Sequence, residues 1–261
     1  MARFALRLAY DGSKFAGWQR QKSGITAQLV LEEALERIYG KRVVAHGASR
    51  TDAGVHALGQ CAHFDTPTGS RSFSPKEIFN ALNAHLPDSL RVFLVRKVGQ
   101  SFHAQFSALS KTYCYRVFNG RVLPPLAVGR CWHIIKPLDI DAMRKGAEFF
   151  VGKKDFGVFG VNSKTVRENT VREIKFFEIR TMAGFVWLRV TGDGFLYRMV
   201  RGMVGALVSI GRGKAAPDWA GEILITQKRD PLQITAPPGG LCLMAVHYQG
   251  WTCGEKKITW S

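Results

Sequence analysis

Alternation of apolar and polar residues is the first pattern in this chain. Between Arg3 and Tyr10 every second residue is large and apolar, which is the period of a half-buried strand. Helical spacing follows Thr26, a residue that can cap a helix, and Gly40 is placed to end that helix. A capping box with proline at the first helical position begins at Ser74 and predicts a second helix.

Strand-like runs complete the first half of the chain. They cover residues 42–46, 60–64 and 91–98, so the predicted order is β-α-β-β-α-β. The second half repeats this order with insertions. Its predicted elements are a strand at 112–118, a helix from Asp139 that Gly152 ends, a hairpin at 171–179 and 184–191, helices at 195–210 and 219–226, and a last strand at 241–248.

This order is that of the split βαβ, or ferredoxin-like, unit. We therefore predict a mixed α+β (α/β) fold of two such units, whose antiparallel sheets join side by side with an active-site cleft between them. The predicted domains are residues 1–104, which carry the candidate catalytic loop, and residues 105–250. Residues 251–261 are expected to form a tail.

Composition adds a charge that a typical globular protein does not need. The chain has 261 residues, and 37 Lys and Arg against 20 Asp and Glu give a net charge of +17. The excess is spread over both halves rather than held in a tail. Distributed positive charge on a folded domain favours a polyanionic partner, with RNA or DNA as the first expectation.

Cysteine usage and hydropathy indicate a reducing, cytosolic protein. The five cysteines include no CxxC pair, which argues against a disulfide framework and structural zinc. His46, His56 and His63 with Cys61 also lack the spacing of zinc ligands. The longest uncharged run, 231–254, is interrupted by Pro-Pro-Gly-Gly, so no membrane span is expected.

The stretch GASRTDAGVHALGQCAHF, residues 47–64, holds the candidate chemistry. Asp52 lies on a short predicted loop between two strands, where a scaffold can present a reactive side chain to a substrate. Arg50, two residues away, favours the ionised form of that carboxylate. The structural alternative is a turn in which Thr51 and Asp52 bond to the backbone and Gly54 takes a positive φ.

Two residues of the second half allow both structural and functional interpretations. Tyr113 lies on a predicted strand, where a buried tyrosine with a bonded hydroxyl is the ordinary case. Arg201 falls within an otherwise apolar helix, so its guanidinium must be paired or must reach the surface. Asp52, from the first half, is the natural partner for it.

Five blocks in order resemble the tRNA pseudouridine synthase A family. They are YDGSKFAGWQRQ at 10–21, SRTDAGVHALGQ at 49–60, SFHAQFSALSKTYCYRVFN at 101–119, GDGFLYRMVRGMVGAL at 192–207 and GLCLMAVHY at 240–248. The resemblance covers nearly the whole chain. Two departures are visible. Ala48-Ser49 stands where many members have a glycine, and Phe195 to Arg198 lacks the histidines that some members carry.

The resemblance implies an isomerase that converts uridine to pseudouridine at positions 38, 39 and 40 in the anticodon stem-loop of tRNA. It implies Asp52 as the nucleophile and leaves open whether the ribose C1′ or the uracil ring is attacked first. Tyr113 is implied to stack on the target base, where it can help remove the C5 proton. Arg201 is implied to pair with Asp52. No metal or other cofactor is expected, because substrate and product are isomers.

Further partners follow from the same resemblance. The family forms homodimers in which each tRNA reaches across both subunits. Arg50 is the candidate for filling the space that a flipped-out uridine leaves, and Trp18, Arg20 and His56 are candidate RNA contacts.

Two other functions are compatible with parts of the pattern. A non-catalytic RNA-binding protein would use the basic surface, but it would gain nothing from a carboxylate among its cations. An enzyme acting on a small molecule would leave the charge of +17 without a purpose. Asp52 distinguishes the first alternative, and tRNA binding at low salt distinguishes the second.

Overall fold

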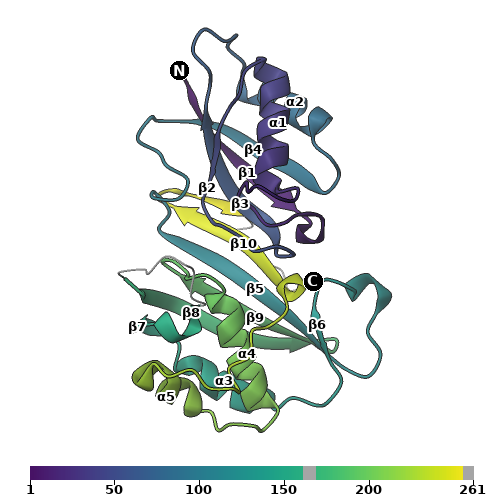
Figure 1. The fold of residues 1–261 in the computed structure, drawn as a ribbon, viewed down its shortest axis with the longest axis vertical. Coiled ribbons are helices and arrows are strands. Elements are labelled where there is room, and N and C mark those ends of the chain that lie inside the picture. The colour runs from purple at the N-terminus through teal and green to yellow at the C-terminus, as the bar shows by residue number, and fades with distance from the viewer. Residues whose placement is uncertain (161–168, 255–261) are drawn as a thin grey trace. The chain divides into compact units, whose positions relative to one another are not determined.

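The computed structural model describes residues 1–160 and 169–254, so most of the predicted tail, 255–261, lies outside the described residues. The predicted mixed α+β class is confirmed, with helices packed on antiparallel strands (Figure 1). The chain divides into two compact units. Unit 1 comprises Met1–Leu109 together with the described residues from Cys242, and unit 2 comprises Ser110–Leu241.

Unit 1 has the strand order of a ferredoxin-like sheet. Strand β1 lies between β4 and β3 and is antiparallel to both, and the short β2 is antiparallel to β3. Strand β10 is parallel to β3 through Cys242 and Leu243, and β11 pairs with β10. The elements are β1 (Arg3–Tyr10), α1 (Ala27–Tyr39), β2 (Ala45–Gly47), β3 (His56–Asp65), α2 (Pro75–His85), β4 (Leu90–Val98), β10 (Leu241–Tyr248) and β11 (Trp251–Gly254).

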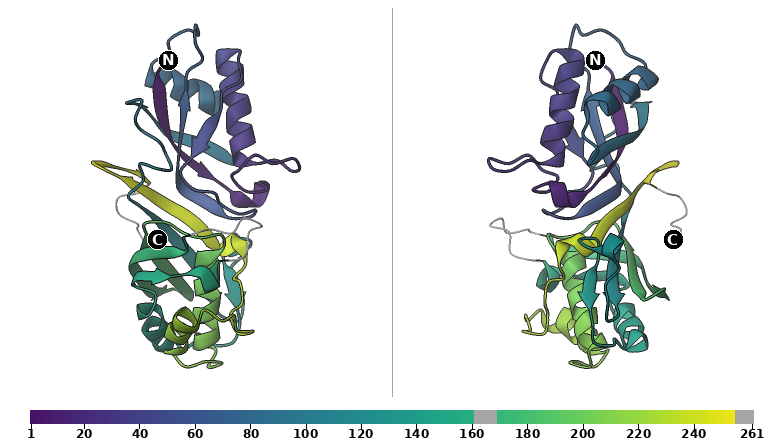
Figure 2. Two further views of the ribbon diagram at one scale, coloured as in Figure 1. Left: turned by 60° about the vertical axis from the view of Figure 1, so that its left-hand side comes forward. Right: turned by 90° about the vertical axis from the view of Figure 1, so that its right-hand side faces the viewer.

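The two helices of unit 1 begin where the sequence predicts. The hydroxyl of Thr26 accepts a hydrogen bond from the Leu29 amide, and Gly40 ends α1 with a φ of 66°. At the start of α2, Ser74 and Glu77 form the predicted capping box. Both helices lie on the same side of the sheet (Figure 2).

Unit 2 is built on a second antiparallel sheet. Its strand order is β5-β9-β8-β7, and the short β6 pairs in parallel with β5. Helices α3 and α4 pack against each other, and α3 also contacts β8. The elements are β5 (Ser110–Asn119), β6 (Trp132–Ile134), α3 (Ile140–Glu148), β7 (Gly152–Asp155), β8 (Val171–Met182), β9 (Phe185–Gly192), α4 (Met199–Gly211) and α5 (Trp219–Thr226).

Helix α4 begins four residues later than predicted. Apolar spacing alone placed its start at Phe195, but Arg198 adopts the left-handed conformation, with a φ of 60°. A left-handed residue interrupts a right-handed helix, so α4 is preceded by a separate turn at Tyr197 and Arg198, in which the Met199 amide donates to the Leu196 carbonyl. Every residue from Met199 to Gly211 is buried, which explains why the periodic pattern gave no clear boundary.

Short strands account for the other differences from the predicted elements. The run 42–46 forms a strand only from Ala45, whereas β3 starts four residues before the predicted Gln60. Strands β6, β7 and β11 were not predicted, and helix α3 ends at Glu148 instead of Gly152. Strand β10 lies in the predicted C-terminal domain, 105–250, but packs with unit 1 from Cys242 onward.

Three histidines of unit 1 form a cluster, His46, His63 and His103. The ring centroids of His63 and His103 are 4.6 Å apart, and those of His63 and His46 are 5.0 Å apart. His63 is buried, and its Nδ1 accepts a hydrogen bond from the backbone amide of Ala104. Burial, with repulsion from His103, His46 and Arg3, lowers the pKa of His63 to about 4.

Acidification should therefore destabilise unit 1 before its carboxylates titrate. The pKa of His63 is lower in the folded chain than its ordinary 6.5, because the fold favours the neutral ring. The free energy of unfolding is therefore at its full value above pH 6.5 and decreases as pH falls towards 4. The loss is on the order of 3 kcal/mol at most. Thermal unfolding followed from pH 8 to pH 4 measures it.

His63→Asn tests the origin of this loss, because its side-chain oxygen can still accept from Ala104 but cannot be protonated. The variant should flatten the melting curve against pH, whereas His85→Asn, at an exposed position, should not. An unchanged slope in His63→Asn would exclude this histidine as the titrating group.

Candidate active site

The Asp52 loop, residues 48–55, joins β2 to β3 as the sequence predicts. Asp52 is half-buried, and its carbonyl accepts a hydrogen bond of 3.1 Å from the Val55 amide. Gly54 has a φ of 80° within this turn, a conformation that favours glycine. The prediction that Gly54 takes a positive φ is thus correct. The same turn leaves the Asp52 side chain partly exposed.

A buried glutamine on β3 holds the start of the Asp52 loop. Gln60 is fully buried, and its side-chain nitrogen donates to the Ser49 carbonyl at 2.7 Å. Its side-chain oxygen accepts from the Ser49 amide at 3.2 Å. One amide side chain therefore satisfies both backbone groups of a loop residue three positions before Asp52.

A second anchor fixes the residue next to Asp52. The hydroxyl groups of Tyr10 and Thr51 are 2.8 Å apart in a buried hydrogen bond. The Thr51 carbonyl accepts from the Trp18 amide at 3.1 Å. At Gly17, whose φ is 98°, a Cβ would lie 2.7 Å from that same carbonyl, so only glycine allows this approach. The segment leading to Asp52 is thus fixed at both Ser49 and Thr51.

Trp18 is part of the support of the loop. Its side chain is only 1% exposed, and its ring stacks on Tyr10 with the centroids 6.2 Å apart. A Cβ at Gly47 would lie 2.3 Å from the indole nitrogen, so the end of β2 packs directly on the ring. This burial favours a positioning role for Trp18 over the RNA contact expected from the sequence.

The other candidate RNA contacts differ in exposure. His56 is buried, and its Nδ1 accepts from the Gly12 amide at 3.1 Å, which also favours a structural role. Arg20 is partly exposed and forms an ion pair of 3.2 Å with Glu32. Arg50 is exposed beside the loop turn. Of these three, the two arginines retain the exposure that a phosphate contact needs.

Tyr113 lies in β5 of unit 2 and is 5% exposed. Its ring meets the ring of Phe195 edge to face, with centroids 5.1 Å apart and an interplanar angle of 84°. It faces the same side of the sheet as Tyr115, whose hydroxyl donates to the Pro237 carbonyl. Burial raises the pKa of Tyr115, so that neighbour stays a neutral hydrogen-bond donor.

Arg201 is buried in the first turn of α4, at 8% exposure. Its Nε donates to the Ala236 carbonyl at 2.7 Å, and its backbone carbonyl accepts from the Ala236 amide at 3.1 Å. The guanidinium is therefore tethered to the segment before β10 rather than directed along the helix surface. The snorkelling interpretation of this arginine does not fit its burial.

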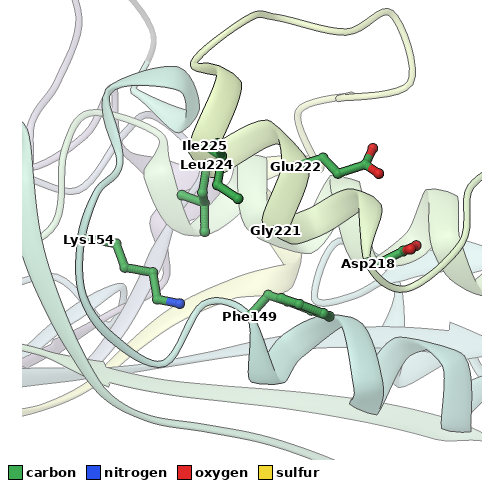
Figure 3. A pocket seen from close by; sticks show the side chains of 7 residues that line it. All are labelled: Phe149, Lys154, Asp218, Gly221, Glu222, Leu224 and Ile225. Carbon is green, nitrogen blue, oxygen red and sulfur yellow. The ribbon is translucent and has the colours of Figure 1, made fainter.

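Unit 2 also contains a separate cavity of about 400 Å³ between the end of α3 and α5 (Figure 3). Its lining is mainly apolar, and the carboxylate of Glu222 points away from the ring of Phe149. None of the predicted site residues lines it. In the part of the chain that is described, no group of three His, Cys, Asp or Glu side chains could hold a metal ion.

Known proteins resemble this chain over almost its full length. The model of the tRNA pseudouridine synthase family matches residues 8–107 and 147–249. The chain belongs to this family. A tRNA pseudouridine synthase A from Methylacidiphilum infernorum is 44% identical over 94% of this chain and 95% of its own length. One from Syntrophotalea carbinolica is 40% identical over 96% and 98%, and one from Maridesulfovibrio salexigens is 42% identical over 97% and 93%.

Membership makes the protein a synthase that acts on uridine in tRNA, which confirms the predicted isomerase. The matched ranges include the Asp52 loop and Arg201 but not Tyr113. Among helices of the described ranges 1–160 and 169–254, none combines the length and the apolar character needed to cross a membrane.

The supports of the synthase loop were missed by sequence reasoning. Gln60 and Tyr10 lie at the borders of predicted strands, where a polar group is unremarkable. The available signal was the position of Gln60 in a run that is otherwise buried, because a buried polar side chain must have a partner.

Replacing Gln60 should impair catalysis more than removing a hydrogen-bonding amide side chain from another part of the protein. Gln60→Met leaves the amide and carbonyl of Ser49 without their partner, and should cost about 1–3 kcal/mol of stability. A displaced nucleophile should also lower kcat about tenfold or more, because small displacements are costly in a positioned site. Pseudouridine formation per folded molecule is the measurement.

Asn119 provides a matched control in unit 2, since its side-chain amide binds the carbonyls of Ile134 and Lys136 and the amide of Leu138. Asn119→Leu should lower the melting temperature without changing kcat. Equal kcat in Gln60→Met and the unmodified enzyme would show that this clamp does not position the loop for catalysis.

Proposed function

We propose that this synthase converts uridine to pseudouridine at positions 38, 39 and 40 in the anticodon stem-loop of tRNA. Family membership supplies the reaction and the tRNA substrate. The net charge of +17 suits a partner with a phosphate backbone. The three positions follow from the family resemblance of the ordered sequence blocks.

Asp52 is the proposed nucleophile, and the rigidity of its loop is the observation that carries the assignment. Ser49 and Thr51 are both held by buried side chains, whereas Asp52 keeps a partly exposed side chain. A nucleophile needs this combination, because it must be fixed in position and still reachable by the substrate. The loop does not contain a second carboxylate.

Arg201 is the proposed partner of the Asp52 carboxylate. The Ala236 carbonyl accepts from the Nε of Arg201, and a carboxylate is a further partner that a buried guanidinium favours. Pairing with Asp52 would keep that carboxylate ionised, which a nucleophile must be.

The chemistry requires one glycosidic bond to break and another to form. The target uridine leaves the helical stack, Asp52 attacks either C1′ or the uracil ring, and the bond from C1′ to N1 is broken. The ring turns and bonds to C1′ through C5, and the bond to Asp52 breaks so that the free carboxylate is restored. C5 loses its proton while N1 gains one. Tyr113 stacks on the base during this step. No cofactor is required, because the atoms of substrate and product are the same.

The remaining proposals concern binding and assembly. Arg50, exposed beside the loop, fills the space left by the uridine or holds the RNA backbone, and Arg20 contacts phosphate. A cytoplasmic homodimer in which both subunits contact one tRNA is proposed from the family resemblance. The predicted boundary between residues 104 and 105 is kept as part of the proposal, with β10 assigned to unit 1.

Family membership weakens both alternatives from the sequence. A non-catalytic RNA-binding protein or a small-molecule enzyme would share the fold but not the family's reaction. Neither alternative has an observation of its own in the described residues.

Asp52→Asn should abolish pseudouridine formation and change tRNA affinity by no more than a few-fold. The amide has the shape of the carboxylate but is not a nucleophile. Release of tritium from C5-labelled uridine in tRNA reports turnover, and filter binding reports affinity. Asp88→Asn, at an exposed turn, is the control that should retain full activity. A normal rate in Asp52→Asn would reject the nucleophile.

Arg201→Lys should keep a positive charge but lose the planar fork that can bind Ala236 and a carboxylate together. We expect kcat to fall about 100-fold with KM nearly unchanged, since the defect lies in the nucleophile rather than in RNA binding. Circular dichroism checks that α4 remains folded. A folded variant with an unaltered kcat would remove the proposed pairing.

A further inference from the structure

Lys111, the second residue of β5, is a half-buried cation that the proposed mechanism does not use. On the neighbouring strand β9, Gly192 lies opposite Lys111 and Val190 lies opposite Tyr113. Because alternate residues of a strand share a face, Lys111 and Tyr113 lie on the same side of the sheet. Their separation of two residues corresponds to about 7 Å along the strand.

Gly192, the partner of Lys111 on β9, has no side chain, and other residues occupy the space beside it. A Cβ at Gly192 would lie 2.9 Å from a methyl carbon of Ile174 and 3.2 Å from the ring of Phe195. Phe195 is also the ring that meets Tyr113 edge to face. Lys111, Phe195 and Tyr113 therefore belong to one continuous wall of unit 2.

Two charged residues of the described ranges, Arg172 and Asp193, act on Lys111. Asp193 is fixed by two hydrogen bonds with the backbone of Glu173, one through its side chain and one through its amide. Arg172 extends across Gly194, where a Cβ would lie 3.4 Å from its Nε. Lys111 and Arg172 are cations of the kind that bind a phosphodiester.

Burial and repulsion make the charge of Lys111 responsive to a ligand. Burial and the neighbouring Arg172 lower the pKa of Lys111 to about 8, and Asp193 opposes this shift in part. The lysine is mostly charged at pH 7 and loses its proton as pH rises through 8. A bound anion would favour the charged form.

We propose that Lys111 binds the phosphodiester of the nucleotide whose base stacks on Tyr113, with Arg172 beside it. This inference rests on the proposed role of Tyr113. Lys111 is two residues, or about 7 Å along the strand, from Tyr113, which is within the length of one nucleotide. It therefore positions the flipped uridine rather than the rest of the tRNA.

Kinetics of Lys111→Met and Lys111→Arg on a tRNA transcript test the proposal. Lys111→Met should raise KM about tenfold and leave kcat within a few-fold. In the unmodified enzyme kcat/KM should decline above pH 8, and Lys111→Arg should lack this decline because arginine stays charged. A KM equal to that of the unmodified enzyme in Lys111→Met, or the same decline in Lys111→Arg, would overturn it.

Binding without turnover separates this inference from the proposed function. In the Asp52→Asn background, Lys111→Met should reduce the slope of log affinity against log salt by about one phosphate contact. Lys145→Met, at an exposed position of α3, should leave the slope unchanged. Activity in Asp52→Asn would reject the proposed function, whereas an unchanged slope with Lys111→Met in an inactive Asp52→Asn would reject only the role of Lys111.

Discussion

The paired hydrogen bonds between Gln60 and the backbone of Ser49 are the contact on which the candidate active site depends. They join a strand in the middle of the unit 1 sheet to a loop that has no regular structure of its own. Loops are ordinarily mobile because their backbone groups exchange partners with water. Here Gln60 replaces water as the partner of the Ser49 backbone, and Tyr10 binds the Thr51 hydroxyl, so the loop acquires the rigidity of the sheet beneath it.

The support extends from the loop into the core of unit 1. Tyr10 is stacked on Trp18, and Trp18 is covered by Gly47, so three segments distant in sequence meet around one buried indole. Large aromatic rings contribute much of their stability by burial, and their hydrogen-bonding groups add direction. The same side chains that stabilise the fold therefore also set the position of Asp52.

The sequence predicted the long elements well, because their signals are local. Caps at Thr26 and Ser74 and the alternation of β1 act within one turn or a few residues. Strands of three or four residues carry too little periodicity, since β6 and β7 exist only because a longer neighbour offers its edge. The start of α4 depends on one backbone angle at Arg198, which no hydrophobic pattern encodes.

The site was predictable to a similar extent. The loop position of Asp52 followed from residue type and context. For Arg201 the sequence left pairing and exposure open, and it did not indicate the burial of Trp18 and His56, because burial depends on segments far away in the chain.

The position of strand β10 has a consequence for protein synthesis. The sheet of unit 1 needs residues that follow all of unit 2, so the ribosome must deliver 110–241 before β10 can dock on β3. Within the described ranges 1–160 and 169–254, every residue of unit 2 is made before the last strands of unit 1.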